Sequence, residues 1–227
     1  MLKTLALAAA TSVAALSANA GVVDFSTLAP GTALTTFDFL NGVEGTASAD
    51  GNNPNSPDVA VVFDTNNDGT SDQDLLSPFT LAGDSSVKRS FGNAIIIQEN
   101  PGNNGVFDPD DDGRGGTLTF EFIETLAFGA FSLLDALKGT SVSLYDDGTL
   151  VSTLVTAIDA DTGNDPDNNL FTILDFKGLQ GDKFVVDFNG RSGALGEFEV
   201  SAVPLPASAL LLLAGVGGLG IAGRRKS

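Results

Sequence analysis

The sequence predicts an all-β domain, a two-sheet sandwich of the jelly-roll type, with a hydrophobic segment on either side of it. Polar and apolar residues alternate in short segments along the middle of the chain, and in residues 117–124 the side chains of Leu118, Phe120 and Phe122 share one face. Most of these segments are bounded by Gly, Asn, Asp or Pro, as strands usually are. No amphipathic helix with capping residues is apparent between the two hydrophobic segments. These observations favour a β-sandwich.

The strands recur along the whole domain. The Asp147-Gly148 pair is typical of a two-residue hairpin turn between two of them. Residues 42–58 are rich in Gly, Asn, Ser and Pro and are predicted to form a surface loop. The predicted strands are, in chain order, residues 59–63, 94–98, 117–124, 128–134, 141–145, 150–157, 171–176, 183–188 and 196–200.

Residues 1–20 have the pattern of a secretory signal peptide. Lys3 gives a short positive start, residues 5–16 are apolar, and Ala18-Asn19-Ala20 is an A-x-A cleavage site. We therefore expect export through the Sec machinery and a mature chain that begins at Gly21. The β-sandwich domain is predicted to occupy residues 21–202, about 180 residues, which suffices for one domain with a packed core.

The C-terminal segment, residues 203–227, combines a short motif, an apolar run and a basic end. The run from Leu205 to Ile221 is just long enough to cross a hydrocarbon core of about 30 Å, and the basic end, residues 224–226, would stay in the cytoplasm. An ordinary membrane anchor is the simpler alternative. The motif consists of Val203, Pro204, Leu205, Pro206 and Ala207.

This order of motif, apolar helix and basic cluster resembles the VPLPA-CTERM class of the PEP-CTERM sorting signals of Gram-negative bacteria. The resemblance implies that an exosortase in the membrane recognises the motif, cuts near it and releases or re-anchors the protein. The single transmembrane helix would then hold the protein only transiently at the inner membrane. The final location implied is the cell surface or the extracellular space.

The composition excludes several classes of function. With the two ends removed, seven basic and 29 acidic residues remain, so the net charge is about −22. Such a surface repels nucleic-acid phosphates and suits divalent cations. There is no Cys and no His, which excludes Ser-His-Asp and Cys-His catalysis and removes the commonest zinc ligand. There is no Trp and one Tyr, which is unusual for sugar-stacking platforms.

Two acidic segments share the pattern V-F-D-x-[ND]-x-D-G, which resembles the first half of a calcium-binding loop. Oxygen ligands at alternate positions can converge on one Ca²⁺, which takes six to eight of them. Neither segment has the Glu expected at the twelfth position, and Asn, Asp and Gly also make good turns. The candidate ligands are Asp64, Asn66, Asp68, Asp72 and Asp74 in the first segment and Asp108, Asp110 and Asp112 in the second. Residues 159–167 are acidic but lack ligand spacing.

A second resemblance covers residues 58–200. It is carried by Val61-Val62-Phe63-Asp64, by Gly92-Asn93-Ala94-Ile95-Ile96-Ile97-Gln98-Glu99 and by Ser132-Leu133-Leu134-Asp135, among others. These segments look like a recurrent domain of secreted bacterial surface proteins, similar to jelly-roll, galactose-binding-like modules. The resemblance implies a structural calcium ion and no established activity. The acidic residue near the last strand is shifted here to Glu197.

Missing catalytic side chains and the sorting signal together predict a non-catalytic protein of the cell surface or of a biofilm matrix. Exopolysaccharide is its expected partner, and a carbohydrate-binding module is the alternative function. A glycosidase would need two carboxylates about 5–10 Å apart across a sugar. The candidates for that role, Glu121, Glu197 and Glu199, are expected on solvated outer faces.

Overall fold

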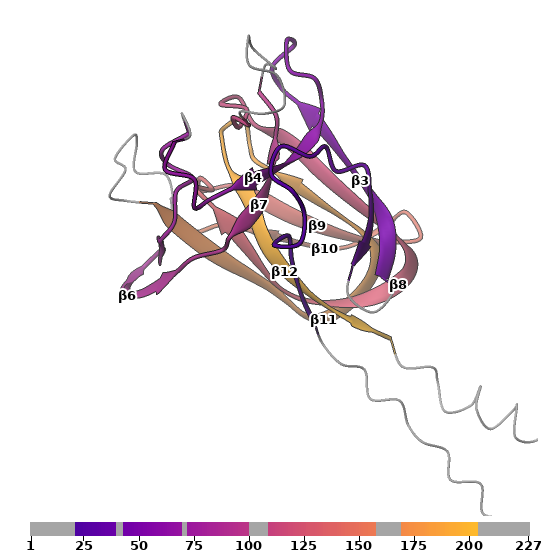
Figure 1. The fold of residues 1–227 in the computed structure, drawn as a ribbon. Coiled ribbons are helices and arrows are strands. Elements are labelled where there is room, and N and C mark those ends of the chain that lie inside the picture. Colours follow the sequence, from indigo (N-terminus) through magenta and orange to yellow (C-terminus); the bar gives the residue numbers. More distant parts are fainter. Residues whose placement is uncertain (1–20, 40–42, 70–71, 100–108, 158–168, 204–227) are drawn as a thin grey trace, which may run out of the picture. The chain divides into compact units, whose positions relative to one another are not determined.

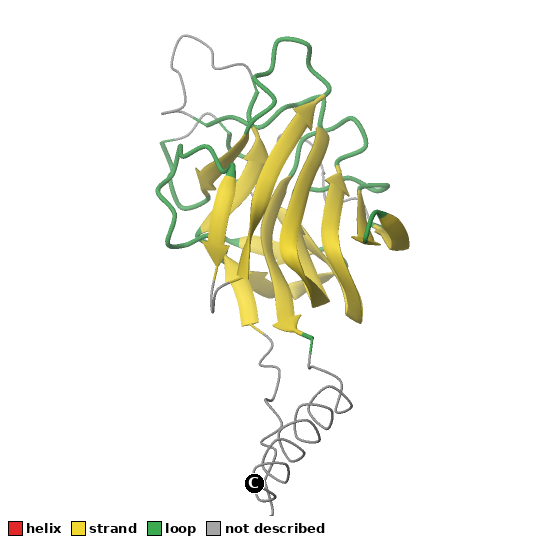
Figure 2. Cartoon of the chain, turned by 90° about the vertical axis from the view of Figure 1, so that its right-hand side faces the viewer, coloured by secondary structure: helices red, strands yellow, loops and turns green. Residues whose placement is uncertain are grey.

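Twelve strands and no helix make up the part of the chain that the computed structural model describes, which is residues 21–39, 43–69, 72–99, 109–157 and 169–203 (Figure 2). Within these residues, no helix is present that could span a membrane. Residues 20–202 form one compact unit on their own. The strands are β1 (Gly21–Asp24), β2 (Thr36–Phe39), β3 (Val43–Gly51), β4 (Ala60–Asp64), β5 (Phe79–Leu81), β6 (Asp84–Arg89), β7 (Asn93–Ile97), β8 (Gly116–Leu134), β9 (Ser141–Asp146), β10 (Thr149–Val155), β11 (Leu170–Asp187) and β12 (Ala194–Ala202).

Two long strands, β8 and β11, run through both layers of the sandwich (Figure 1). The first half of β8 pairs with β3, and its second half pairs with β12. β11 pairs antiparallel with both halves of β8, with register shifts between Asp175 and Leu179 and between Gly181 and Lys183. Bulges of this kind bend a strand and increase its twist. One continuous sheet thereby folds over on itself.

The first layer has the order β10-β9-β11-β8-β3-β2, and the second the order β11-β8-β12-β7-β4. In the second layer β1 pairs with β12, while β5 lies parallel to β11 and carries β6 as a hairpin partner. The prediction of an all-β, jelly-roll-like sandwich is confirmed. The signal peptide and the C-terminal helix of that prediction lie outside the described residues.

Phenylalanine fills the space between the layers. Phe120 and Phe184 stack in the first layer with ring centroids 4.8 Å apart, and Phe131 and Phe198 stack in the second at 5.6 Å. The two pairs meet, because Phe184 and Phe198 are 5.0 Å apart in an edge-on contact. Burying each such ring contributes about 1.5–3 kcal/mol, so a chain without disulfides can be stable through its core.

The strands predicted from alternation are found, but two pairs of them are single strands. Residues 117–124 and 128–134 are both part of β8, and residues 171–176 and 183–188 are both part of β11. At the hairpin between β9 and β10, Asp147 and Gly148 have φ angles of 47° and 73°. Both values are positive, as a type I′ turn requires.

The prediction of a loop over residues 42–58 is wrong for its first half, because Val43–Gly51 form β3. After Val43, the inward positions of β3 are occupied by Gly45, Ala47 and Ala49, so the apolar alternation is faint in the sequence. Gly45 allows a close strand approach, since a Cβ there would lie 2.2 Å from the carbonyl oxygen of Glu121.

Candidate metal centre

Three carboxylates meet at one point between loops of the second layer. One oxygen from each of Asp72, Asp110 and Asp111 can be chosen so that all three lie within 4.8 Å of one another. Asp72 and Asp111 are only 6% and 7% exposed, whereas Asp110 is half-buried. Charges this deeply buried are costly unless an opposite charge compensates them, so the cluster has the chemistry of a cation site.

The end of β7 brings a neutral oxygen to the same place. Gln98 follows β7 and forms an isolated antiparallel bridge with Asp111. The flanking hydrogen bonds, from Glu99 N to Asp110 O (2.7 Å) and from Asp112 N to Ile97 O (2.9 Å), make this a narrow pair in which the two side chains lie close together. Gln98 is 2% exposed, and neither end of its amide has a hydrogen-bond partner among the described residues.

A second buried amide lies beside the turn that carries Asp72. Asn169, which immediately precedes β11, donates from Nδ2 to the carbonyl oxygens of Gln73 (3.3 Å) and Leu76. Its Oδ1 is buried and has no partner within the described part of the chain. Buried side-chain oxygens are almost always hydrogen-bonded or bound to an ion. The two amides thus offer further oxygen ligands for a cation, Gln98 from across the bridge to Asp111 and Asn169 from beside the turn that carries Asp72.

Burial dominates the electrostatics of the cluster. Burial, together with the charge of Asp111 and a hydrogen bond with Asp74, raises the pKa of Asp72 to about 11. Burial also raises the pKa of Asp111 well above its usual value, against the opposing effect of a 2.7 Å hydrogen bond from Gly193 N. The charges of Asp74, Asp110 and Asp135 act in the same direction as burial on Asp111. In the absence of a cation, the carboxyl group of Asp72 therefore stays protonated at neutral pH in the folded domain.

The structure separates the ligands predicted in the first acidic segment. Asp64 ends β4, and one of its carboxylate oxygens accepts a 2.9 Å hydrogen bond from the backbone of Asn66, which makes a local turn. Asn66 and Asp68 are exposed. Asp72 is in the cluster, and the side chain of Asp74 is hydrogen-bonded to that of Asp72. Only the end of this segment thus reaches the cluster.

The second acidic segment divides in a similar way. Asp110 is in the cluster, whereas Asp112 binds Ser56 Oγ (2.6 Å) and the backbone nitrogens of Asn53 (3.3 Å) and Arg114 (2.9 Å). The carboxylate of Asp112 thereby ties the loop after β3 to this segment. Asp108 lies outside the described residues, as do residues 159–167.

Sequence reasoning missed Asp111, Gln98 and Asn169. Asp111 falls between the alternate positions of the calcium-loop pattern, and both amides lie far from it in sequence. A usable signal was present at Gln98, because it is a polar residue at the end of the apolar run Ala94–Ile97. Asp135, which ends the segment Ser132–Asp135 named above, is buried, has a φ of 48° and accepts a 3.3 Å hydrogen bond from Ser192.

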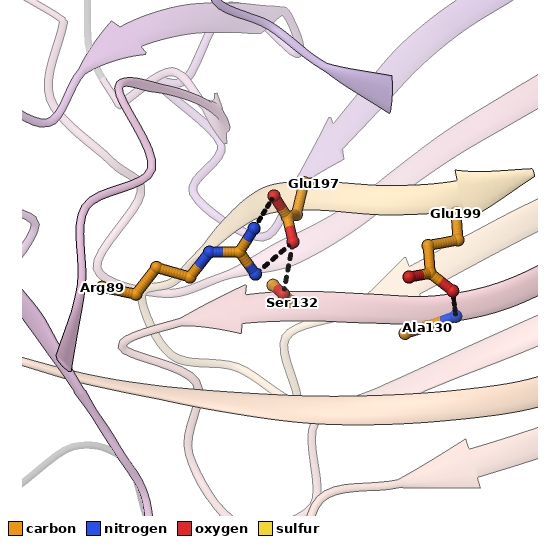
Figure 3. Close-up of polar contacts among 5 residues, drawn as sticks. All are labelled: Arg89, Ala130, Ser132, Glu197 and Glu199. Carbon is orange, nitrogen blue, oxygen red and sulfur yellow. Dashed lines mark hydrogen bonds and ion pairs between the residues drawn. The ribbon is translucent and has the colours of Figure 1, made fainter. Parts of the chain in front are cut away.

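The acidic residues of β12 are engaged elsewhere (Figure 3). Arg89 of β6 holds Glu197 with two contacts of 2.6 and 2.9 Å, and Ser132 donates to the same carboxylate at 3.3 Å. Glu199 accepts a 3.3 Å hydrogen bond from the backbone of Ala130. Glu197 is thus an ion-pair partner on the outer face of the second layer, and it is not in the carboxylate group described above.

The model of the PEP-CTERM protein-sorting motif matches residues 202–226. The chain carries a PEP-CTERM sorting motif. The motif indicates an exported protein that is anchored through its C-terminal segment before an exosortase processes it. The match covers the motif and apolar run that the sequence suggested, and it identifies them as a sorting signal in place of an ordinary anchor.

Comparison with the curated proteins gives no match to this chain. Among solved structures, two fucose-binding modules of Streptococcus pneumoniae are 19% and 21% identical over 40% of this chain, with TM-scores of 0.29 and 0.28. The matches span 66% and 68% of those modules, so the first falls just short of two thirds. A GH31 CBM32-2 module bound to GalNAc is 15% identical over 81% of this chain and 97% of the module, with a TM-score of 0.29. Likeness at this level does not transfer a ligand.

Proposed function

We propose that this chain is a non-catalytic protein of the cell surface or extracellular matrix whose β-sandwich is stabilised by one calcium ion. The sorting motif supports the location, and the carboxylates of Asp72, Asp110 and Asp111 carry the calcium proposal. Ca²⁺ prefers six to eight oxygen ligands and accepts irregular geometry. Three carboxylates together with the amide oxygens of Gln98 and Asn169 offer hard oxygens alone.

The role of the ion would be structural. The candidate ligands come from segments that are far apart in the chain, namely the loop after β4, the end of β7, the strand-like segment before β8 and the residue before β11. An ion bound to all of them would link these segments in the folded state. The unfolded chain would bind the ion much more weakly, because its ligands are not held together. Calcium outside the cell would therefore add to the stability of a domain that has no disulfide.

Thermal unfolding of residues 21–203 tests the calcium proposal. At a Ca²⁺ concentration 100 times the dissociation constant, binding to the folded state alone adds about 2.7 kcal/mol of stability. We expect Ca²⁺ to raise the midpoint of the wild type, and Asp111→Ala to abolish the rise. Asp68→Ala is the matched control, because Asp68 belongs to the same sequence pattern but is exposed. A full response in Asp111→Ala, or no response in the wild type, would refute the proposal.

Carbohydrate binding is a second candidate function, and one observation favours it. An open groove of about 610 Å³ lies on the outer face of the first layer, lined by residues of β2, β3 and β8. Binding of glycans to the domain, measured on an array of bacterial polysaccharides, tests this candidate. Absence of binding to every glycan would remove it and leave the calcium proposal intact.

A further inference from the structure

The second layer of the sandwich carries an apolar cluster on its outer face, separate from the main core between the layers. Successive residues of β4 and β7 point to opposite faces, so Val62 and Ile95 join the main core whereas Phe63 and Ile96 join the outer cluster. All five residues of β7 are buried. Both faces of the sheet are therefore covered at this place.

Residues 72–92, which we call the covering segment, lie over the outer cluster. They supply Leu75, Phe79 and Phe91 to it, and none of these 21 positions, all of which the structure describes, belongs to the main core. The ring of Phe91 lies 5.7 Å from that of Phe79 and 5.2 Å from that of Phe171 at the start of β11. The main core can therefore stay packed when the covering segment moves.

The covering segment is attached to the sheet over a short length. β5 pairs in parallel with Leu170 and Phe171, the first two residues of β11. β6 pairs with β5, has all six of its residues exposed and lies at the periphery of the molecule (Figure 1). The ion pair of Arg89 with Glu197 involves a side chain that is 46% exposed (Figure 3), and such pairs contribute little. Segments of this kind open locally at a lower free energy than the core.

The candidate metal centre lies at the start of the covering segment. Of the three clustered carboxylates, Asp72 belongs to the covering segment, whereas Asp110 and Asp111 precede β8. Asn169, which precedes β11, donates hydrogen bonds to backbone carbonyls of the covering segment, and its buried Oδ1 has no partner within the described part of the chain. An ion bound by these oxygens would tie the covering segment to the sheet below it.

We propose that the calcium ion holds the covering segment closed. Without the ion, residues 72–92 open locally while the sandwich around the main core stays folded. The inference rests on the calcium ion of the proposed function and specifies what that ion controls. The open state binds Ca²⁺ more weakly because it no longer supplies Asp72, so the ion shifts the equilibrium toward the closed state. At 100 times the dissociation constant, the open population should fall by up to about 100-fold.

Cleavage after Lys88 measures the open population, because proteolysis follows the fraction of molecules that are open when reclosing is fast. Lys88 is the one lysine of the covering segment. The 21–203 domain is digested in EDTA and in excess Ca²⁺ with a lysine-specific protease that needs no calcium, and cleavage at Lys88 is followed by mass spectrometry. We expect Ca²⁺ to slow this cleavage by about tenfold or more. Asp72→Asn should abolish the protection, and the exposed Asp68→Asn should retain it.

A matched pair of variants distinguishes local opening from unfolding of the whole domain. Leu75→Ala shortens a fully buried side chain of the outer cluster, and Val142→Ala shortens one of the main core. In EDTA, Leu75→Ala should speed cleavage at Lys88 by about tenfold or more, because the closed state loses packing. Val142→Ala should leave the rate unchanged, because the main core is intact in both the open and the closed state.

Equal acceleration by both variants would overturn the inference, since the covering segment would then open only with the whole domain. Ca²⁺ that raises the thermal midpoint but leaves cleavage at Lys88 unchanged would also overturn it, while the calcium proposal would stand. If Ca²⁺ changes neither the midpoint nor the cleavage rate, both the calcium proposal and this inference are wrong.

Discussion

Replacing Asp72 by Asn should stabilise the metal-free domain and weaken its response to calcium. Burial raises the pKa of Asp72 to about 11, so this carboxyl stays protonated in the folded state at pH 7 without metal. The unfolded chain releases that proton with a pKa of about 3.9. Taking up a proton on folding costs about 1.36 kcal/mol per pH unit above that value, hence at most about 4 kcal/mol at pH 7.

Asparagine avoids this cost, because its neutral amide needs no proton and can still accept the 3.3 Å hydrogen bond from Asp111 N. In EDTA, Asp72→Asn should therefore raise the free energy of unfolding by up to about 4 kcal/mol. In Ca²⁺ the same variant lacks one charged ligand and should gain little of the roughly 2.7 kcal/mol expected for the wild type at 100 times the dissociation constant. The stabilisation by the substitution should therefore be about 2.7 kcal/mol smaller in Ca²⁺ than in EDTA.

Urea unfolding followed by circular dichroism, in EDTA and in excess Ca²⁺, measures both values for the wild type, for Asp72→Asn and for Asp68→Asn. The exposed Asp68 should show no effect in either condition. A variant that is destabilised equally in both conditions would refute the reasoning, because Asp72 would then act as an ordinary packing residue.

Three further predictions concern the site and the core. In EDTA the free energy of unfolding should be highest near pH 4 and should fall as the pH rises. The reason is that the pKa of Asp72, raised to about 11 in the folded state, favours folding only while the same carboxyl is protonated in the unfolded chain. Urea midpoints measured across this pH range should show the fall, and Ca²⁺ should reduce it. Gly45→Ala should cost about 1–3 kcal/mol, since the new Cβ would lie 2.2 Å from the carbonyl oxygen of Glu121; a neutral result by thermal unfolding would contradict the strand approach described above. Phe184→Ala should cost about 3–5 kcal/mol, because its ring contacts both layers of the core; a loss below 1 kcal/mol would show that the layers do not depend on this ring.

Alternation of polar and apolar residues along the chain is sufficient to predict the central strands of this fold, because one face of each packs into the phenylalanine-rich core. It cannot show that residues 117–124 and 128–134 are one strand, since three consecutive exposed residues, 123–125, interrupt the alternation where β8 changes its partner from β3 to β12. It also fails for β3, whose inward residues after Val43 are glycine and alanine. A strand with small inward side chains is defined by its neighbours, which a single sequence does not reveal.

The candidate site, like β3, depends on neighbours that are distant in the sequence. Local spacing directs attention to Asp64, Asn66 and Asp68, where the structure forms a turn with a 2.9 Å hydrogen bond. Asp111 and Gln98 are brought together by the pairing of two distant segments. The sequence shows many acidic residues that could supply oxygen ligands, but the tertiary fold determines which of their oxygens converge.

The stoichiometry of calcium binding to the 21–203 domain tests the central proposal most directly. Titration calorimetry should find one ion per domain, with binding lost in Asp111→Ala and retained in the Asp64→Ala and Asp68→Ala double variant. Binding that survives Asp111→Ala but disappears in the double variant would place the ion in the sequence-predicted loop and contradict the buried site. Absence of any binding at millimolar Ca²⁺ would contradict a calcium-stabilised domain altogether.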